Sequence, residues 1–318
     1  YEGLTSYDAR TGDEKERERF KVNEGGLALT EADPIVDAQR IYVSGRGRIR
    51  AMVRSSGKEE WKADDLGTAA RGAELIVAGW NPPYDRWAAE LPGLTRAVIG
   101  AACASGARVL LPGNVYVYGE GAPPVLGPAT PHAAHNPLGR LRVEMEDAFA
   151  ASGVPTLVLR AGDFLDDRPS GNWFDRVIAA KARQGVLSYP GRMDVPHAWA
   201  WLPDLARAAV GLAERPDWEP GMTDIPFPGF TLTGAELAAA LGRALGRPVA
   251  ARPMAWWPVR AATPVWPLAR HLTEMRYLWD MPHRLDGAAF AAALPGFRET
   301  PLDEALARAL QPAERVAA

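Results

Sequence analysis

The fold is decided by residues 109–119, Val-Leu-Leu-Pro-Gly-Asn-Val-Tyr-Val-Tyr-Gly, in which a short apolar run leads into a turn that carries two tyrosines. Such a run predicts a strand buried on both faces, as in a parallel sheet. Residues 86–105 before it and 140–152 after it have helical composition, and Gly106 and Gly153 stand where helix C-cap glycines are expected. A strand between two such helices is typical of a βαβ arrangement.

Further short apolar or β-rich runs predict strands at residues 41–43, 49–53, 75–78 and 156–160. We therefore predict an α/β fold, a Rossmann-like doubly wound parallel sheet with a smaller, mainly helical C-terminal substrate-binding subdomain. The predicted parts are a divergent N-terminal segment, a nucleotide-binding domain and the substrate subdomain, at residues 1–40, 41–165 and 166–318.

The composition indicates which kinds of partner and which cellular compartment to expect. Of the 318 residues, 47% are hydrophobic and 24% charged, as in globular proteins, and the net charge of −3 gives no basic surface for nucleic acid. No apolar run is long enough to predict a membrane span. Cys103 is the only cysteine, which excludes an intramolecular disulfide and favours a cytoplasmic protein.

Small residues end the strand predicted at 75–78, where Ala78, Gly79 and Trp80 are followed by Asn-Pro-Pro. Open parallel sheets bind ligands at the carboxyl ends of their strands, so we expect these residues to contact a cofactor. We expect no metal site, because the His132-x-x-His135 pair has no nearby cysteine or carboxylate. Hydrolysis by a serine nucleophile lacks the Gly-x-Ser-x-Gly turn.

The ending Val-Tyr-Gly at residues 117–119 resembles the extended short-chain dehydrogenases/reductases, which include the NAD-dependent epimerases and dehydratases. The resemblance puts Asn114 at the position of the catalytic serine or threonine. In residues 135–146 it puts Leu138 at the catalytic tyrosine and Arg142 at the lysine, next to the cofactor. The usual proton donor is therefore absent, and Tyr116 is the nearest alternative.

The same resemblance covers roughly residues 48–310 and implies further site residues. Ala161 and Gly162 follow the strand whose end lies beside the nicotinamide. Asn172 falls where the family often contacts substrate, and His197 lies in a segment that resembles the family's return of the chain to the fold. With Tyr118, they are the candidates for contact with a small-molecule substrate. The resemblance also implies a homodimer paired through the two long helices.

Two residues support the binding of a dinucleotide cofactor, and one segment departs from the family's pattern. The family's Gly-x-x-Gly-x-x-Gly turn, which brings backbone N–H groups to the pyrophosphate, has no match, since Ser44-Gly45-Arg46-Gly47-Arg48 leaves no room for a helix before the next strand. Arg54 follows that strand, and a guanidinium there favours the 2′-phosphate of NADP over NAD. Asp64 falls where relatives contact adenine.

Three functions follow as alternatives. The first is an NAD(P)-binding oxidoreductase or epimerase-like enzyme acting on a small carbonyl or sugar-type substrate. The second is a catalytically inactive dinucleotide-sensing or scaffold protein of the same fold, favoured by the missing tyrosine and lysine. The third is a protein that binds no dinucleotide, with residues 1–45 filling the groove.

Overall fold

A computed structural model describes the strands in residues 35–63 and, with side chains, residues 70–168 and 170–311. The chain divides into two compact units, one formed by residues 1–74 with 97–107 and the other by residues 75–96 with 108–318. The domain boundaries near residues 40 and 165 remain predictions.

The strands of the first unit form an antiparallel sheet in the order β1-β2-β3-β4. Their bounds are Ile35–Val36, Arg40–Gly45, Arg48–Val53 and Glu59–Ala63. The strands expected at residues 41–43 and 49–53 are thus present, but their expected place in a parallel sheet is wrong. Gly45 pairs with Arg48, and a connection this short cannot hold the crossover that parallel neighbours need.

The second unit contains a parallel sheet in the order β12-β8-β6-β5. Its strands in chain order are β5 (Leu75–Val77), β6 (Arg108–Gly113), β8 (Thr156–Arg160) and β12 (Met222–Pro226). The predicted α/β fold with a parallel sheet is therefore confirmed.

Helices α2 (Trp87–Ser105) and α3 (Pro137–Ser152) connect β5 to β6 and β6 to β8. Gly106 and Gly153 follow them with φ of 74° and 71°, in the left-handed region that glycine tolerates, as their C-cap roles require. Helix α3 begins three residues before the predicted start because Pro137 occupies its first turn, where proline costs no hydrogen bond.

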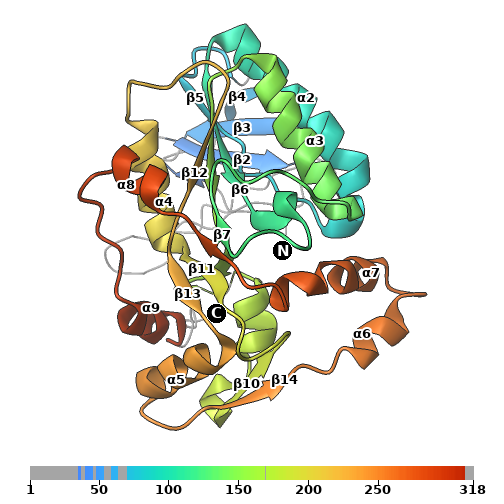
Figure 1. Cartoon of the computed structure of the whole chain (residues 1–318). Coiled ribbons are helices and arrows are strands. Elements are labelled where there is room, and N and C mark those ends of the chain that lie inside the picture. Colours follow the sequence, from blue (N-terminus) through green and yellow to red (C-terminus); the bar gives the residue numbers. More distant parts are fainter. Residues whose placement is uncertain are drawn as a thin grey trace. The chain divides into compact units, whose positions relative to one another are not determined.

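Within the second unit, helices cover both faces of the sheet. Figure 1 shows α3 on one side of it, and α4 (Leu202–Ala213) and α8 (Ala288–Ala293) on the other. Leu157 and Leu159 of β8 pack with Leu205 and Leu212 of α4 and with Phe290 of α8. The fully buried β8 thus shows the continuous apolar pattern of a central parallel strand.

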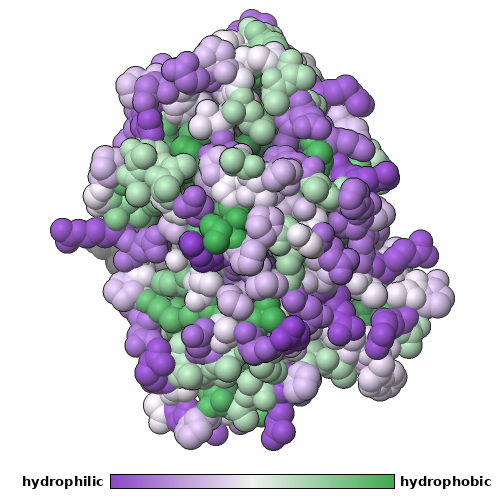
Figure 2. Space-filling view, viewed as in Figure 1, coloured by the Kyte–Doolittle hydropathy of each residue, from purple (hydrophilic) through white to green (hydrophobic). Residues whose placement is uncertain are grey.

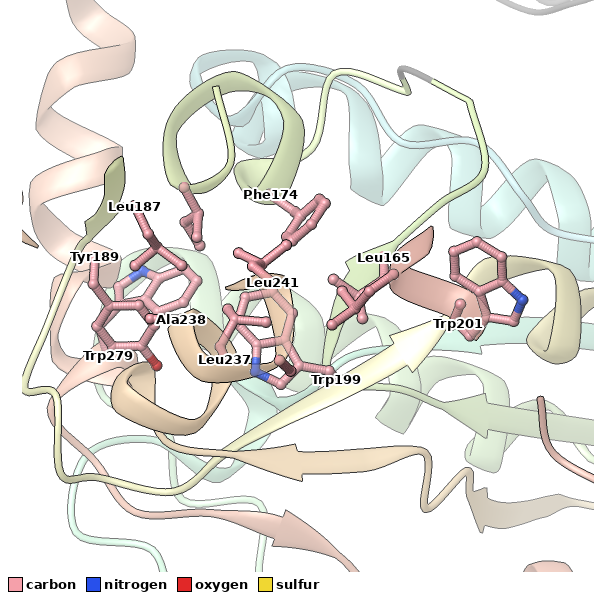
Figure 3. Close-up of a cluster of buried hydrophobic side chains, with 14 of the residues drawn as sticks. Leu165, Phe174, Leu187, Tyr189, Trp199, Trp201, Leu237, Ala238, Leu241 and Trp279 are labelled. Carbon is pink, nitrogen blue, oxygen red and sulfur yellow. The ribbon is translucent and has the colours of Figure 1, made fainter. Parts of the chain in front are cut away.

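A separate aromatic core lies in the C-terminal part. It is built around the sheet β13-β11-β9, the pair β10-β14, and helices α5 and α9. Trp199, Trp201, Trp279, Tyr189 and Phe174 are buried in it (Figure 3). These elements are β9 (Asp163–Leu165), β10 (Val186–Tyr189), β11 (His197–Trp201), β13 (Phe230–Leu232), α5 (Gly234–Leu245), β14 (Ala250–Pro253) and α9 (Leu302–Ala309).

Shorter elements complete the described chain. They are η1 (Tyr84–Arg86), η2 (Val115–Tyr118), β7 (Val125–Leu126), η3 (Phe174–Ile178), η4 (Ala182–Gln184), α6 (Trp257–Ala262), α7 (Pro267–Glu274), η5 (Met275–Trp279) and β15 (Arg284–Leu285). Among the described helices, none is long and apolar enough to cross a membrane. Hydrophilic and apolar residues are intermixed on the face seen in Figure 2.

Candidate functional site

The carboxyl ends of β5, β6 and β8 meet at one edge of the parallel sheet. The N–H of Ala78, just after β5, donates to the carbonyl of Leu110, and the N–H of Ala161, just after β8, donates to the carbonyl of Gly113. These hydrogen bonds extend the strand ladder past the strand ends. The segments that follow therefore start from one rigid edge, where parallel sheets place their ligands.

A buried ion network fixes the turn that follows β6. The Arg160 guanidinium, at the end of β8, donates to both carboxylate oxygens of Glu146, at 3.1 and 2.8 Å, and to Asp224 at 2.9 Å. It also donates to the carbonyl oxygen of Asn114 at 2.6 Å. Burial alone lowers the pKa of Arg160, but Glu146 and Asp224 outweigh it and raise that pKa above its ordinary value.

Asn114 shapes the turn rather than pointing a free amide oxygen at a ligand. Its side-chain oxygen accepts a hydrogen bond from the backbone N–H of Tyr116 at 3.0 Å and so caps the single turn η2. Asn114 therefore positions Tyr116, whose half-buried ring extends from this turn.

Two tyrosine hydroxyls face each other at this edge. The Tyr116 and Tyr84 hydroxyl oxygens are 2.5 Å apart, and the rings lie at an edge-to-face angle with centroids 6.2 Å apart. Burial raises the pKa of Tyr84 to about 12 and the pKa of Tyr116 well above its ordinary value. Asp163 raises both pKa values further and Arg142 lowers them. Both tyrosines therefore hold their protons at neutral pH.

Tyr84 was not predicted from the sequence. It opens the single turn η1 that follows the Asn-Pro-Pro segment after β5, and Trp87 packs edge-to-face on it with centroids 5.0 Å apart. The sequence did place Tyr84 directly after the ligand-binding end of a strand, which could have marked it as a candidate. Its partner Tyr116 lies 32 residues away in sequence, so local pattern could not pair the two tyrosines.

Arg142, which the resemblance puts at the catalytic lysine position, contacts Trp87, and Trp87 packs against both tyrosines. Its guanidinium carbon is 4.5 Å from the ring centroid of Trp87, a cation–π contact. Its Nη2 donates to the side-chain oxygen of Asn81 at 3.4 Å, and its side chain is 7% exposed. Burial lowers the pKa of Arg142, which nevertheless remains a cation at neutral pH.

An aspartate that follows β8 contacts one of a pair of histidines. The Asp163 carboxylate is 2.6 Å from Nε2 of His197. The His197 ring stacks on Trp279 at 4.3 Å between centroids and meets His283 edge-on at 4.4 Å. Asp163 was missed by the sequence reasoning, although it follows Gly162 directly.

Other predicted residues lie at the same edge with local roles. Ala78 and Ala161 are buried. Gly162 packs so tightly that an added Cβ would meet the carbonyl oxygen of Ala198 at 2.2 Å, which is a packing reason for glycine. Gly79 is exposed, with no atom within 4 Å of such a Cβ. Trp80 has a buried indole N–H without a partner among the described residues.

Two predicted residues differ in setting from these, and two more lie outside the described residues. Tyr118 is buried beneath the Arg160 guanidinium, and its hydroxyl donates to the carbonyl of Gly127 at 3.5 Å. The Asn172 side-chain oxygen accepts from the backbone N–H of Asp175 in the turn before η3. Arg54 and Asp64 lie outside the described residues. No group of three or more metal-ligating side chains occurs in the described part of the chain.

The described edge fits the reactive half of a dinucleotide. Among the described residues, no atom lies within 4 Å of a Cβ added at Gly79, and the buried indole N–H of Trp80 and the buried Nε–H of Arg142 have no hydrogen-bond partner. The adenosine half has no comparable support. The sequence has no glycine-rich turn for the pyrophosphate.

Neither a known protein family nor a curated protein matches this sequence. Solved structures do match. A nucleoside-diphosphate-sugar epimerase from Staphylococcus aureus is 17% identical, with a TM-score of 0.55 over 76% of this chain and 79% of that chain. The UDP-glucuronic acid 4-epimerase from Bacillus cereus is 13% identical, with a TM-score of 0.59 over 76% of each chain.

A reductase has the same likeness. Triphenylmethane reductase from Citrobacter sp. is 17% identical, with a TM-score of 0.56 over 77% of this chain and 79% of that chain. At these identities the likeness is one of fold. It confirms the Rossmann-like fold and the resemblance to structures of the epimerase/dehydratase and short-chain dehydrogenase type.

Proposed function

We propose that this chain is an NAD(P)-dependent oxidoreductase or epimerase-like enzyme that acts on a small carbonyl or sugar-type substrate. The observation that carries the proposal is the pair of hydroxyls of Tyr84 and Tyr116, 2.5 Å apart, beside Arg142 at the ligand-binding edge of the sheet. The structural neighbours support it, since one is a UDP-glucuronic acid 4-epimerase in complex with NAD. Ala78, Gly79, Trp80 and Arg142 are the residues that would hold the nicotinamide half.

A bound nicotinamide supplies or accepts the hydride, and the chain must manage the proton. In the reducing direction the carbonyl oxygen becomes an alkoxide, which needs a neutral donor. Tyr116 is such a donor, because burial keeps its pKa high and its proton in place. When Tyr116 gives up this proton, the Tyr84 hydroxyl donates to the resulting phenolate, and the Arg142 cation stabilises its charge.

The first experiment measures dinucleotide binding by the full chain. NADPH and NADH are titrated while nucleotide fluorescence and melting temperature are followed, because a ligand of the native state raises apparent stability. We expect NADPH to bind and Arg54→Ala to weaken it relative to NADH. Failure of both nucleotides to bind up to millimolar levels would refute the proposal and favour the protein without a dinucleotide.

The second experiment separates an enzyme from a dinucleotide-sensing protein. With a carbonyl substrate found by screening, we expect Tyr116→Phe to lower kcat by about 10²-fold or more with NADPH binding unchanged. The control is Tyr277→Phe, since the Tyr277 hydroxyl is also buried but has no partner among the described residues. Binding without turnover of any carbonyl, or equal losses in the two variants, would favour the inactive alternative.

A further inference from the structure

Arg142 carries a buried positive charge for which the described residues supply no counterion. Its contacts with hydrogen-bond acceptors are the Asn81 oxygen at 3.4 Å and the Met145 sulfur at 3.7 Å, and its Nε has none. The side chain is 7% exposed. A buried charge is costly unless it is paired, so Arg142 needs a partner that the described residues do not provide.

The neighbouring carboxylates already have other partners. Glu146, one turn further along α3, is held at both oxygens by Arg160, and the Asp163 carboxylate is bound to His197. Arg160 shows what a structural arginine looks like in this protein, because two carboxylates and a backbone carbonyl satisfy it. Arg142 lacks every one of these features within the described chain.

The surroundings of Arg142 leave its edge for a ligand. One face of the guanidinium is occupied by the Trp87 ring, so hydrogen bonds must be made in the guanidinium plane. One of its contacts there, at 3.4 Å, is to Asn81, an exposed residue whose oxygen can be displaced. A planar guanidinium fork matches a carboxylate with two parallel hydrogen bonds.

We propose that Arg142 binds the carboxylate of a small acidic carbonyl substrate, such as a 2-oxo acid, beside the hydroxyl of Tyr116. The inference deepens the proposed function by naming the substrate class, and rests on it for the reaction. The substrate carboxylate supplies the missing counterion, and the adjacent carbonyl oxygen takes the proton from Tyr116.

The test uses oxamate, an unreactive analogue of a 2-oxo acid, and oxamide, its neutral counterpart. Titration calorimetry on the full chain, with and without NADPH, is expected to show binding of oxamate and not of oxamide. We expect Arg142→Met to weaken oxamate binding by at least about tenfold, since the charge-assisted bidentate pair is lost. Arg140→Met, an exposed arginine on the same helix, is the matched control and leaves binding unchanged.

Stability gives an independent readout. Because the described residues give its charge no partner, Arg142→Met is expected to melt at the same temperature as the wild-type protein or higher, whereas a structural arginine would lower the melting temperature. If Arg142→Met fails to fold, the expectation that Arg142 does not stabilise the protein is wrong. Oxamate binding is then measured with Arg142→Lys instead. Lysine keeps the charge but not the fork, so oxamate binding that is weaker than in the wild-type protein, measured without NADPH, supports the proposal.

The outcomes separate this inference from the proposed function. NADPH binding without oxamate binding, or oxamate binding that survives in Arg142→Met, overturns the carboxylate site alone. Oxamate binding that depends on Arg142 in a protein that binds no dinucleotide supports the carboxylate site and overturns the oxidoreductase proposal.

Discussion

The pH dependence of stability should be governed in part by His283. This side chain is 1% exposed, and its Nδ1 lies 2.9 Å from the carbonyl oxygen of Met281. A carbonyl only accepts, so Nδ1 carries the proton, and Nε2 is buried with no partner among the described residues. Burial, with a smaller contribution from His197, lowers the pKa of His283 from 6.5 to about 3.

The sign follows from the lowered pKa. Above pH 6.5 the imidazole is neutral in both states and costs nothing. As the pH falls from 6.5 towards 3, the unfolded chain binds a proton that the folded protein refuses, so stability is lost. The slope is about 1.4 kcal/mol per pH unit, which gives a loss of about 2 kcal/mol between pH 7.5 and pH 5.

The assay compares the wild-type protein with His283→Asn, whose amide replaces the Nδ1–H donor and cannot titrate. Urea unfolding followed by tryptophan fluorescence gives the free energy of unfolding at pH 7.5 and pH 5. The variant is less stable overall but should lose about 2 kcal/mol less over this interval. His135→Asn, at an exposed histidine, should keep the wild-type slope. Parallel pH profiles for wild type and His283→Asn would refute the reasoning.

Two further predictions concern the scaffold of the site. Arg160→Met leaves the buried Glu146 carboxylate without its cation and should cost about 3–5 kcal/mol in urea unfolding, against under about 1 kcal/mol for Arg140→Met on the exposed face of α3. A loss as small as that of the control would show that the network is not needed for stability. Gly162→Ala forces a Cβ to 2.2 Å from the Ala198 carbonyl oxygen and should cost about 1–3 kcal/mol. Gly79→Ala meets open space and should stay within about 0.5 kcal/mol, so equal effects at the two glycines would contradict the packing argument.

Within the second unit, local sequence was enough to predict secondary structure. The β8 strand has the predicted bounds, Thr156–Arg160, because four consecutive apolar or β-favouring residues before Arg160 suit a strand buried on both faces. Thr233 and Glu236 form the capping box that begins α5, and their Thr-x-x-Glu spacing is the sequence signature of that motif.

The candidate site shows what local pattern could not supply. Tyr116 and Arg142 could be named because they stand at landmarks of a known order, yet nothing adjacent to them identifies Tyr84 or Asp163 as partners. Pairing across 32 residues depends on how the ends of β5 and β6 meet, which is a property of the sheet.

The sequence by itself determined the parallel sheet of the second unit, its helix ends and the absence of the usual catalytic tyrosine and lysine, because these depend on periodicity, glycine positions and residue identity. Only the tertiary structure decided that β2 and β3 are antiparallel and that Arg160 has its counterions, while the described residues supply none to Arg142. Strand direction and charge pairing are set by contacts between distant segments, and those contacts exist only once the chain has folded.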